Sequence, residues 1–242
     1  MLITLPVYVK EKDNEKGVLH LWLTDNTHIV DIGPVSGDDD AAASSLLYKS
    51  GNGNEDELIA LYEKKKAGEE TPSPAMFSVR LTAQLERVKE VLKTWKEVDE
   101  RVSKLCTNSH APEGASTNTP CSSNFNITDG LVGFLSGNFS ETTWSDEYLG
   151  VNATVRDGTA AATKATKTSD GVAFRGAWAE WPVGAQGENQ LYHFANYNFT
   201  LVATVSAEKV PEEFTPISLI GMKMNGDENP VLLDCRTTAE VS

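Results

Sequence analysis

The chain has 242 residues, of which 40% are hydrophobic, enough to bury the cores of one large or two medium domains. Thirty-five acidic residues against 21 basic ones give a formal net charge of −14 at pH 7, which disfavours nucleic acid and anionic membranes as partners. The sequence contains no continuous apolar run of about 18 residues, and Met1 leads straight into LITLPVYV. We therefore expect neither a membrane span nor a signal peptide in this chain.

Residues 1–81 predict short β-strands separated by turns. The strand-like runs are LITLPVYV, VLHLWLT, THIVDIG, ASSLLYK, ELIALYE and AMFSVRL. Gly-Pro, Ser-Gly and Gly-Asn-Gly elements between them are typical of turns. The spacing favours an antiparallel meander repeated in a propeller or barrel. About six strands make roughly one and a half four-stranded blades, so we expect an open sheet edge.

Residues 82–106 predict a long amphipathic helix, because the apolar period changes there to about three and a half residues. The expected apolar stripe is Leu81, Leu85, Val88, Leu92, Trp95, Val102 and Leu105. Lys93 and Glu97, spaced four apart, can pair on the other side. A coiled coil is the alternative, but Trp95 in the stripe favours a helix that packs on its own protein.

Residues 107–128 are rich in Ser, Thr, Asn and Pro and predict an exposed connector. Residues 129–242 predict an incomplete β-sandwich, because the final DCRTTAEVS lacks the alternation of the runs before it. Those runs are LVGFLSG, GVNATV, GVAFRGAWAEW, NFTLVATVS and TPISLIGMKM. Aromatic residues in this part either fill its core or line a sugar-binding surface. They are Trp178, Trp181, Tyr192, Phe194, Tyr197 and Phe199.

Cysteines and glycosylation sequons point to the secretory pathway. Cys106 and Cys121 flank the connector and can form one disulfide, which leaves Cys235 without a partner. Three reduced thiols are an equally good interpretation of the spacing. The four Asn-X-Ser/Thr sequons, all after residue 125, are at Asn126, Asn138, Asn152 and Asn198.

The sequence predicts no metal site and no cofactor. The four histidines, His20, His28, His110 and His193, are far apart, and the cysteines form no C-x-x-C pair. The acidic run 38–40 lacks EF-hand spacing and predicts a solvated loop rather than a calcium site. The motifs of phosphate-binding loops, dinucleotide-binding folds and serine hydrolases are absent from the sequence. Tyr48 ends an apolar strand, which alone favours a core or rim residue over a nucleophile.

Several long strings carry a resemblance to a known family. They are LHLWLTDNTHIVDIGPVSGDDDAAASSLLYKSG, ELIALYEKKK, LERVKEVLKTWKEVDERVSKLC, GLVGFLSGNFSETTW and AWAEWPVGAQGENQLYHFANYNFTLVATVS. The chain closely resembles the trypanosomal trans-sialidase and surface-glycoprotein superfamily from residue 1 to about 233. The resemblance implies a mainly β chain: the last blades of a six-bladed sialidase β-propeller, a long linker helix, and a truncated concanavalin-A-like or laminin-G-like sandwich. It also implies a glycoprotein, at the cell surface or secreted, whose partners are sialylated glycans or host surface proteins.

The same resemblance assigns the role of nucleophile to one residue and implies that the residues it would work with are not at their expected positions in this chain. The string matching SSLLYK in active members carries the nucleophilic tyrosine, which corresponds to Tyr48 here. A glutamate base, an aspartate acid/base and two of three carboxylate-binding arginines match segments upstream of Met1. The third arginine, and a tryptophan two residues before it, fall at or near Lys16 and Asn14, and residues 1–79 contain no arginine. Lysine cannot supply the bidentate fork of arginine.

We therefore predict a non-catalytic member of the family that binds host glycans or proteins, with Tyr48 as a relic. An exo-α-sialidase or trans-sialidase that uses Tyr48 as nucleophile is the first alternative. The second alternative is a truncated gene product with no stable function, suggested by the position of Met1 inside a strand and by the unusual tail.

Overall fold

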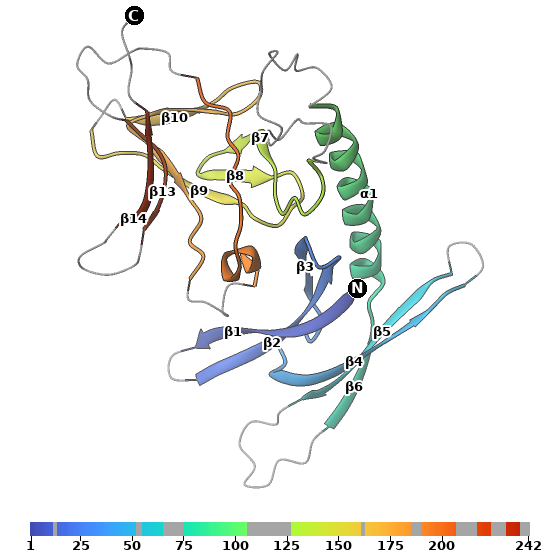
Figure 1. Cartoon of the computed structure of the whole chain (residues 1–242). Coiled ribbons are helices and arrows are strands. Elements are labelled where there is room, and N and C mark those ends of the chain that lie inside the picture. The colour runs from blue at the N-terminus through green and yellow to red at the C-terminus, as the bar shows by residue number, and fades with distance from the viewer. Residues whose placement is uncertain are drawn as a thin grey trace, which may run out of the picture. The chain divides into compact units, whose positions relative to one another are not determined.

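The computed structural model describes residues 1–11, 14–51, 55–64, 75–105, 127–160, 163–184, 190–206, 217–223 and 231–237. Within these ranges the chain is mainly β, with one long α-helix and one short 3-10 turn (Figure 1). Its contacts divide it into two compact units, Met1–Phe199 and Thr200–Ser242. None of the helices in the described parts combines the length and apolar character that a membrane span requires.

The beginning of the chain forms two three-stranded antiparallel sheets. The first, in the order β1-β2-β3, consists of β1 (Leu2–Glu11), β2 (Asn14–Thr24) and β3 (Ile29–Pro34). The second, in the order β4-β5-β6, consists of β4 (Ala41–Lys49), β5 (Glu57–Lys64) and β6 (Ala75–Arg80). All six strands lie where the sequence predicts them, and the prediction of a mainly β fold is confirmed.

The helix α1 (Thr82–Leu105) begins directly after β6 (Figure 1). Its buried residues follow spacings of three and four: Leu85, Val88, Val91, Trp95, Val98 and Val102. The prediction was wrong for two members of the stripe, Leu92 and Leu105, because their side chains are exposed. Val91 and Leu92 lie three and four positions after Val88, spacings that both fit a helix face, and the structure buries Val91. The predicted pair of Lys93 and Glu97 is present, with a shortest N–O distance of 3.7 Å.

The sandwich part of the first unit contains a four-stranded and a two-stranded antiparallel sheet. The larger sheet, ordered β12-β9-β8-β7, consists of β7 (Leu135–Ser140), β8 (Thr143–Asp146), β9 (Ala153–Arg156) and β12 (Trp178–Glu180). The smaller one pairs β10 (Lys164–Lys167) with β11 (Val172–Arg175). The rings of Trp144 and Phe174 lie 5.9 Å apart and connect the two sheets. The 3-10 turn η1 (His193–Asn196) follows.

The second unit corrects two predictions. Residues 200–206 form no strand, although NFTLVATVS predicts one, and Leu201, Val202 and Val205 are exposed. The apolar pattern is present there, but within the described residues this segment has no hydrogen-bonded neighbouring strand. Conversely, β14 (Val231–Thr237) extends into the tail and pairs with β13 (Ile217–Lys223), with two register irregularities. The expectation that regular structure ends before DCRT was therefore wrong up to Thr237, because pairing with a neighbour imposes the strand.

One hydrophobic core runs through the N-terminal sheets, the helix and the start of the sandwich part. It joins residues of β2 and β5 to the buried face of α1 and to Tyr148, which lies after β8. The predicted boundaries at residues 81, 106 and 128 fall inside the unit that this core holds together, Met1–Phe199. The segments on either side of α1 are therefore packed as one body.

Candidate functional site

Tyr48 lies near the end of β4, opposite Leu58 of β5. Directly opposed residues of an antiparallel pair share one sheet face, so Tyr48 lies on the same face as Leu58, Ala60 and Tyr62, which belong to the core. At this end of the sheet the cover is incomplete, and the Tyr48 side chain is 53% exposed. The structure places this half-exposed residue at the rim of the core.

Among the residues that the structure describes, the Tyr48 hydroxyl has no hydrogen-bonded neighbour that could activate it. Across the described parts of the chain, no side chain forms a hydrogen bond with this hydroxyl. A cation lies within electrostatic range: the pKa of Lys89 is raised, chiefly by its hydrogen bond to Glu86, with smaller contributions from Asp56 and Tyr48. A phenol with an ordinary pKa near 10 needs a carboxylate base to act as a nucleophile at neutral pH. The described geometry does not supply this base.

Arg80, the first arginine of the chain, lies on the opposite face of the sheet from Tyr48. It pairs with Ile59 in the β5–β6 ladder, and Ile59 alternates with Leu58 along β5. Its guanidinium contacts Glu57 with an N–O distance of 2.8 Å, and Lys49 lies 3.9 Å from the same carboxylate. Because Arg80 lies on the other sheet face and is paired with Glu57, it is not placed to bind the carboxylate of a ligand at Tyr48.

A shallow cleft of about 390 Å³ lies at this end of the sheet and reaches the start of α1. Its charged lining residues are Lys49, Glu55, Asp56, Glu57 and Arg80. Three carboxylates against two cations do not favour a sialic-acid carboxylate. Among the residues that the structure describes, Tyr48 is not part of the lining, so the cleft and the tyrosine do not form one site.

The two residues matched to the third arginine and its tryptophan lie in β2. Asn14 pairs with Glu11 in the β1–β2 ladder, and its side chain lies outside the described residues. Lys16 pairs with Val9, and its charge is one of those that lower the pKa of Asp39. The largest cause of this lower pKa is the hydrogen bond from Lys64, which outweighs the opposing effect of burial. The charge of Lys16 therefore faces a carboxylate of the protein itself.

The acidic run is part of the loop structure. Asp39 binds the Lys64 ammonium and the Tyr62 hydroxyl, and Asp40 accepts the backbone N–H of Gly17. Asp38 is exposed. In the described part of the chain, no group of three or more His, Cys, Asp or Glu side chains could hold a metal ion. Asp39 and Asp40 thus bind groups of the protein itself and hold the turn in place.

A polar cluster that the sequence analysis missed lies where α1 meets the sandwich part; we call it the helix–sandwich joint (His28, Trp95, Asp99, Asp146 and Tyr148). The His28 ring stacks on Tyr148 at 4.2 Å and lies 5.1 Å from Trp95. The Trp95 indole donates to the Tyr148 carbonyl at 2.9 Å, and the Tyr148 hydroxyl donates to Asp99 at 2.7 Å. Burial, and then the bond to Asp99, raises the pKa of Tyr148.

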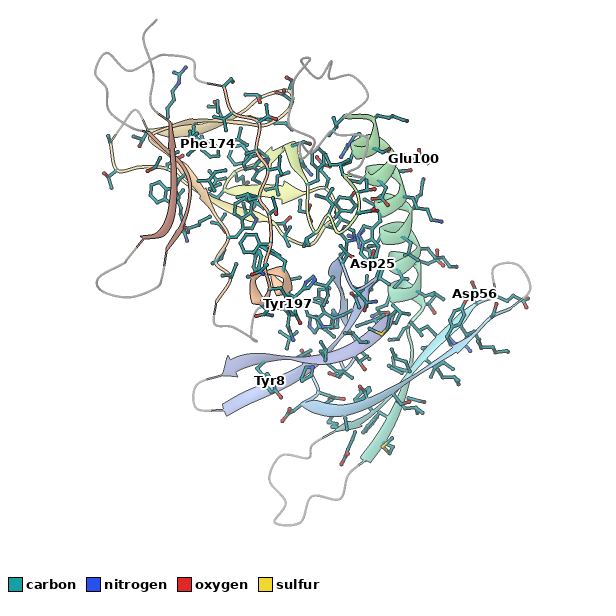
Figure 2. All side chains as sticks on the ribbon, viewed as in Figure 1. Tyr8, Asp25, Asp56, Glu100, Phe174 and Tyr197 are labelled. Carbon is teal, nitrogen blue, oxygen red and sulfur yellow. The ribbon has the colours of Figure 1, made fainter. Side chains whose placement is uncertain are left out.

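His28 brings the β2–β3 turn into this joint. Asp25 Oδ2 lies 3.0 Å from His28 Nδ1, and Asp25 Oδ1 accepts the backbone N–H groups of Thr27 and His28. Burial raises the pKa of Asp25, but these hydrogen bonds together lower it by more. The hydrogen bond of the His28 side chain contributes most to this lowering. Figure 2 shows Asp25 beside α1, whereas Glu100 lies on the outer side of the same helix. The joint therefore connects the N-terminal sheets, the helix and the loop after β8.

Asp146 organises that loop. Its carboxylate is fully buried and accepts backbone N–H groups of Phe134, Tyr148, Gly150 and Val151 at 2.7 to 3.2 Å. Its own backbone N–H donates to Asn152 Oδ1 at 2.8 Å. A buried carboxylate is tolerated only where its oxygens are satisfied, as they are here. In the sequence, the run SDEYLGVN signals such a turn through Asp146, Gly150 and Asn152.

The predicted modification sites differ in their surroundings. Asn138, Asn152 and Asn198 are exposed, and Asn152 also uses its side-chain oxygen in the loop held by Asp146. Asn126, Cys106 and Cys121 lie outside the described residues, and glycosylation at all four sequons and the disulfide stay predictions. Cys235 lies in β14.

Two family models match the chain. One, described as the trans-sialidase C-terminal domain, matches residues 127–241, and the other, a BNR repeat-like domain, matches residues 1–63. Two curated relatives come from Trypanosoma cruzi. Sialidase 85-1.1 is 32% identical over 222 residues, which are 90% of this chain and 25% of that protein. A protein named sialidase is 31% identical over 236 residues, 96% of this chain and 18% of that protein.

Solved structures of Trypanosoma rangeli sialidase resemble the chain closely. The complex with 2,3-difluoro-KDN matches with a TM-score of 0.73 and 34% identity, over 98% of this chain and 34% of that one. The complex with sialic acid matches with a TM-score of 0.68 and 32% identity, over 98% of this chain and 36% of that one. The chain thus spans about a third or less of the length of these relatives.

Proposed function

The chain belongs to the trans-sialidase family, and we propose that it is a non-catalytic member that acts by binding sialylated glycans. Its place of action is the cell surface or the extracellular medium. One relative of known structure is described in complex with sialic acid, which supports a glycan as the ligand class. Host surface proteins that carry such glycans are the corresponding partners.

The observation that carries this proposal is the position of Arg80 relative to Tyr48. Recognition of the sialic-acid carboxylate calls for planar, permanently charged guanidinium groups. Arg80 lies on the other sheet face and is paired with Glu57, and residues 1–79 contain no arginine. The cations closer to Tyr48 are lysines, and Lys89 is itself paired with Glu86. Among the described residues, Tyr48 therefore has neither a hydrogen-bonded base nor a facing arginine.

Three assays on the purified chain test the proposal. A fluorogenic sialoside measures hydrolysis, and sialyllactose with a labelled galactoside acceptor measures transfer; we expect neither above the background of the Tyr48→Phe variant. Immobilised sialylated glycans and their desialylated counterparts measure binding, and we expect binding to the sialylated set above that of a surface without glycan. Turnover that disappears in Tyr48→Phe, or equal absence of binding to both glycan sets, contradicts the proposal.

A sialidase that uses Tyr48 is the second candidate, because Tyr48 is half exposed and the relatives bear the name sialidase. In that case hydrolysis depends on Tyr48 and is insensitive to Arg80→Ala, since Arg80 lies on the other face. The non-catalytic proposal expects both variants to equal the unmodified chain in the hydrolysis assay.

A further inference from the structure

We propose that the outer face of the four-stranded sandwich sheet binds a neutral hexose through Trp178, Arg156 and Glu180. Trp178 of β12 pairs directly with Arg156 of β9, and Glu180 follows Trp178 by two positions. Directly opposed residues, and residues two apart on one strand, share a sheet face. The three side chains therefore project from the same surface, at the edge strand of the sheet.

This surface faces away from the sandwich core. The residues that alternate with the three, Val155 and Ala179, lie on the other face together with Ala153 and Trp144. Val155 and Ala153 are buried, and Trp144 contacts Phe174 of the second sheet. The core is thus filled from the inner face, and Trp178 is not needed to complete it.

Trp178 is exposed and yet held in place. Its side chain is 50% exposed. The indole Nε1–H donates to Glu180 Oε2 at 3.3 Å, and Arg156 Nε donates to Glu180 Oε1 at 2.7 Å. The carboxylate therefore orients both the indole and the guanidinium, which lowers the entropy lost when a ligand binds.

The chemistry of this surface fits a sugar ring. A hexose has one face of C–H groups that can lie on the indole, and hydroxyls at its edge that need donors and acceptors. Arg156 has five N–H donors, of which one is bonded to Glu180, and its side chain is more than half exposed. The hydroxyls of Thr143 and Thr154, cross-strand partners on this face, lie in the next row.

The charges of this surface and of the whole chain favour a neutral sugar over an anionic one as the ligand. Arg156 and Glu180 neutralise each other in an ion pair, and the chain as a whole carries −14, so this surface gives no net attraction to an anionic ring. The fitting unit of a sialylated glycan is the uncharged hexose that carries the sialic acid. In this form the inference rests on the proposed function and names the sugar that this part of the chain contacts.

Titration of the full chain with 3′-sialyllactose and with lactose, followed by calorimetry and tryptophan fluorescence, tests the site. We expect Trp178→Ala to weaken binding of both sugars about tenfold or more, as truncation of a central aromatic contact does. Trp178→Phe should keep most of the affinity but lose the fluorescence change. Tyr8→Ala, which removes another exposed aromatic residue on β1 (Figure 2), should change neither.

The outcomes separate the two proposals. If the unmodified chain binds and Trp178→Ala binds equally well, the Trp178 site is wrong while the proposed function stands. If sialyllactose binds and lactose shows no binding even at millimolar concentration, the neutral-hexose assignment is wrong. If the unmodified chain binds neither sugar, both proposals are wrong. A circular dichroism spectrum of Trp178→Ala that matches the unmodified chain excludes misfolding as the cause of a loss.

Discussion

The sheet end that carries Tyr48 and the helix–sandwich joint differ in how far their polar groups are buried and in what they are bonded to. At the end of the sheet that carries Tyr48, the charged side chains of Lys49, Glu57 and Arg80, on the opposite face, are partly exposed and paired with one another. In the joint, Asp146 is fully buried and bonded to four backbone N–H groups, and the indole of Trp95 is bonded to a buried carbonyl. Exposed ion pairs contribute little to stability, whereas a buried, satisfied group is costly to disturb.

The residues of the joint are needed for folding, whereas the residues around Tyr48 would matter only for catalysis. The joint depends on residues from three segments, the β2–β3 turn, α1 and the loop after β8, and each supplies a specific side chain. The Tyr48 face has kept an accessible phenol without a hydrogen-bonded carboxylate or a facing arginine. Substitutions in the joint should therefore change stability strongly, and substitutions around Tyr48 should change it little.

The largest effect is expected for Asp146→Ala. This change leaves four backbone N–H groups without their acceptor, and each buried unsatisfied donor costs about 1–3 kcal/mol. We expect a loss of about 4 kcal/mol or more in the free energy of unfolding, measured by urea denaturation with fluorescence detection. Asp170→Ala is the matched control, because Asp170 is exposed and bonded to neighbouring hydroxyls at 3.2 and 3.4 Å. Equal midpoints for the two variants would contradict the role given to Asp146.

Trp95→Phe should have the next largest effect. It removes the buried hydrogen bond to the Tyr148 carbonyl and part of the ring that contacts His28. We expect a loss of about 2–3 kcal/mol in the free energy of unfolding. The control is Trp178→Phe, the same substitution at an exposed position, which should stay within about 0.5 kcal/mol. A similar loss in both variants would mean that the joint has no special role.

The sequence predicted the elements of the fold better than it predicted the joint. The six N-terminal strands and α1 follow from apolar periods of two and of about three and a half, which are local properties. Leu92 was misplaced because Val91 and Leu92 are adjacent and both apolar, three and four positions after Val88, so the pattern alone did not show which of them is buried. The segment 200–206 has a strand pattern, but a strand also needs a partner, and pattern alone does not reveal one.

The joint could not be predicted because its residues meet only in three dimensions. His28, Trp95 and Tyr148 are separated by more than 50 residues at each step, and each has an ordinary local context. Asp146 was within reach, since the run SDEYLGVN combines residues typical of side-chain-capped turns. At Tyr48, the resemblance supplied the chemical role, and the register of β4, β5 and β6 showed which side chains share its face.

A smaller effect is expected from acid at Asp39. The pKa of its carboxyl is lowered in the folded chain, chiefly by Lys64, so folding favours the ionised form. The resulting stability is present above the ordinary pKa near 3.9 and is lost as the pH falls through the lower, folded-state pKa. Asp39→Asn should reduce stability at pH 6 and flatten its decline between about pH 5 and pH 2, measured by urea midpoints. Asp38→Asn, at an exposed neighbour, should keep the slope of the unmodified chain.

Tyr48→Phe should have the smallest effect. The hydroxyl has no hydrogen-bond partner among the described residues, and the ring, which phenylalanine retains, lies at the rim of the core. We expect the free energy of unfolding to change by less than about 0.5 kcal/mol and glycan binding to stay the same. Tyr62→Phe is the matched comparison on the same sheet face: its hydroxyl donates to Asp39, so its loss should cost about 1 kcal/mol. A larger loss of stability in Tyr48→Phe than in Tyr62→Phe would contradict this expectation, because it would mean that the Tyr48 hydroxyl has a hydrogen-bond partner.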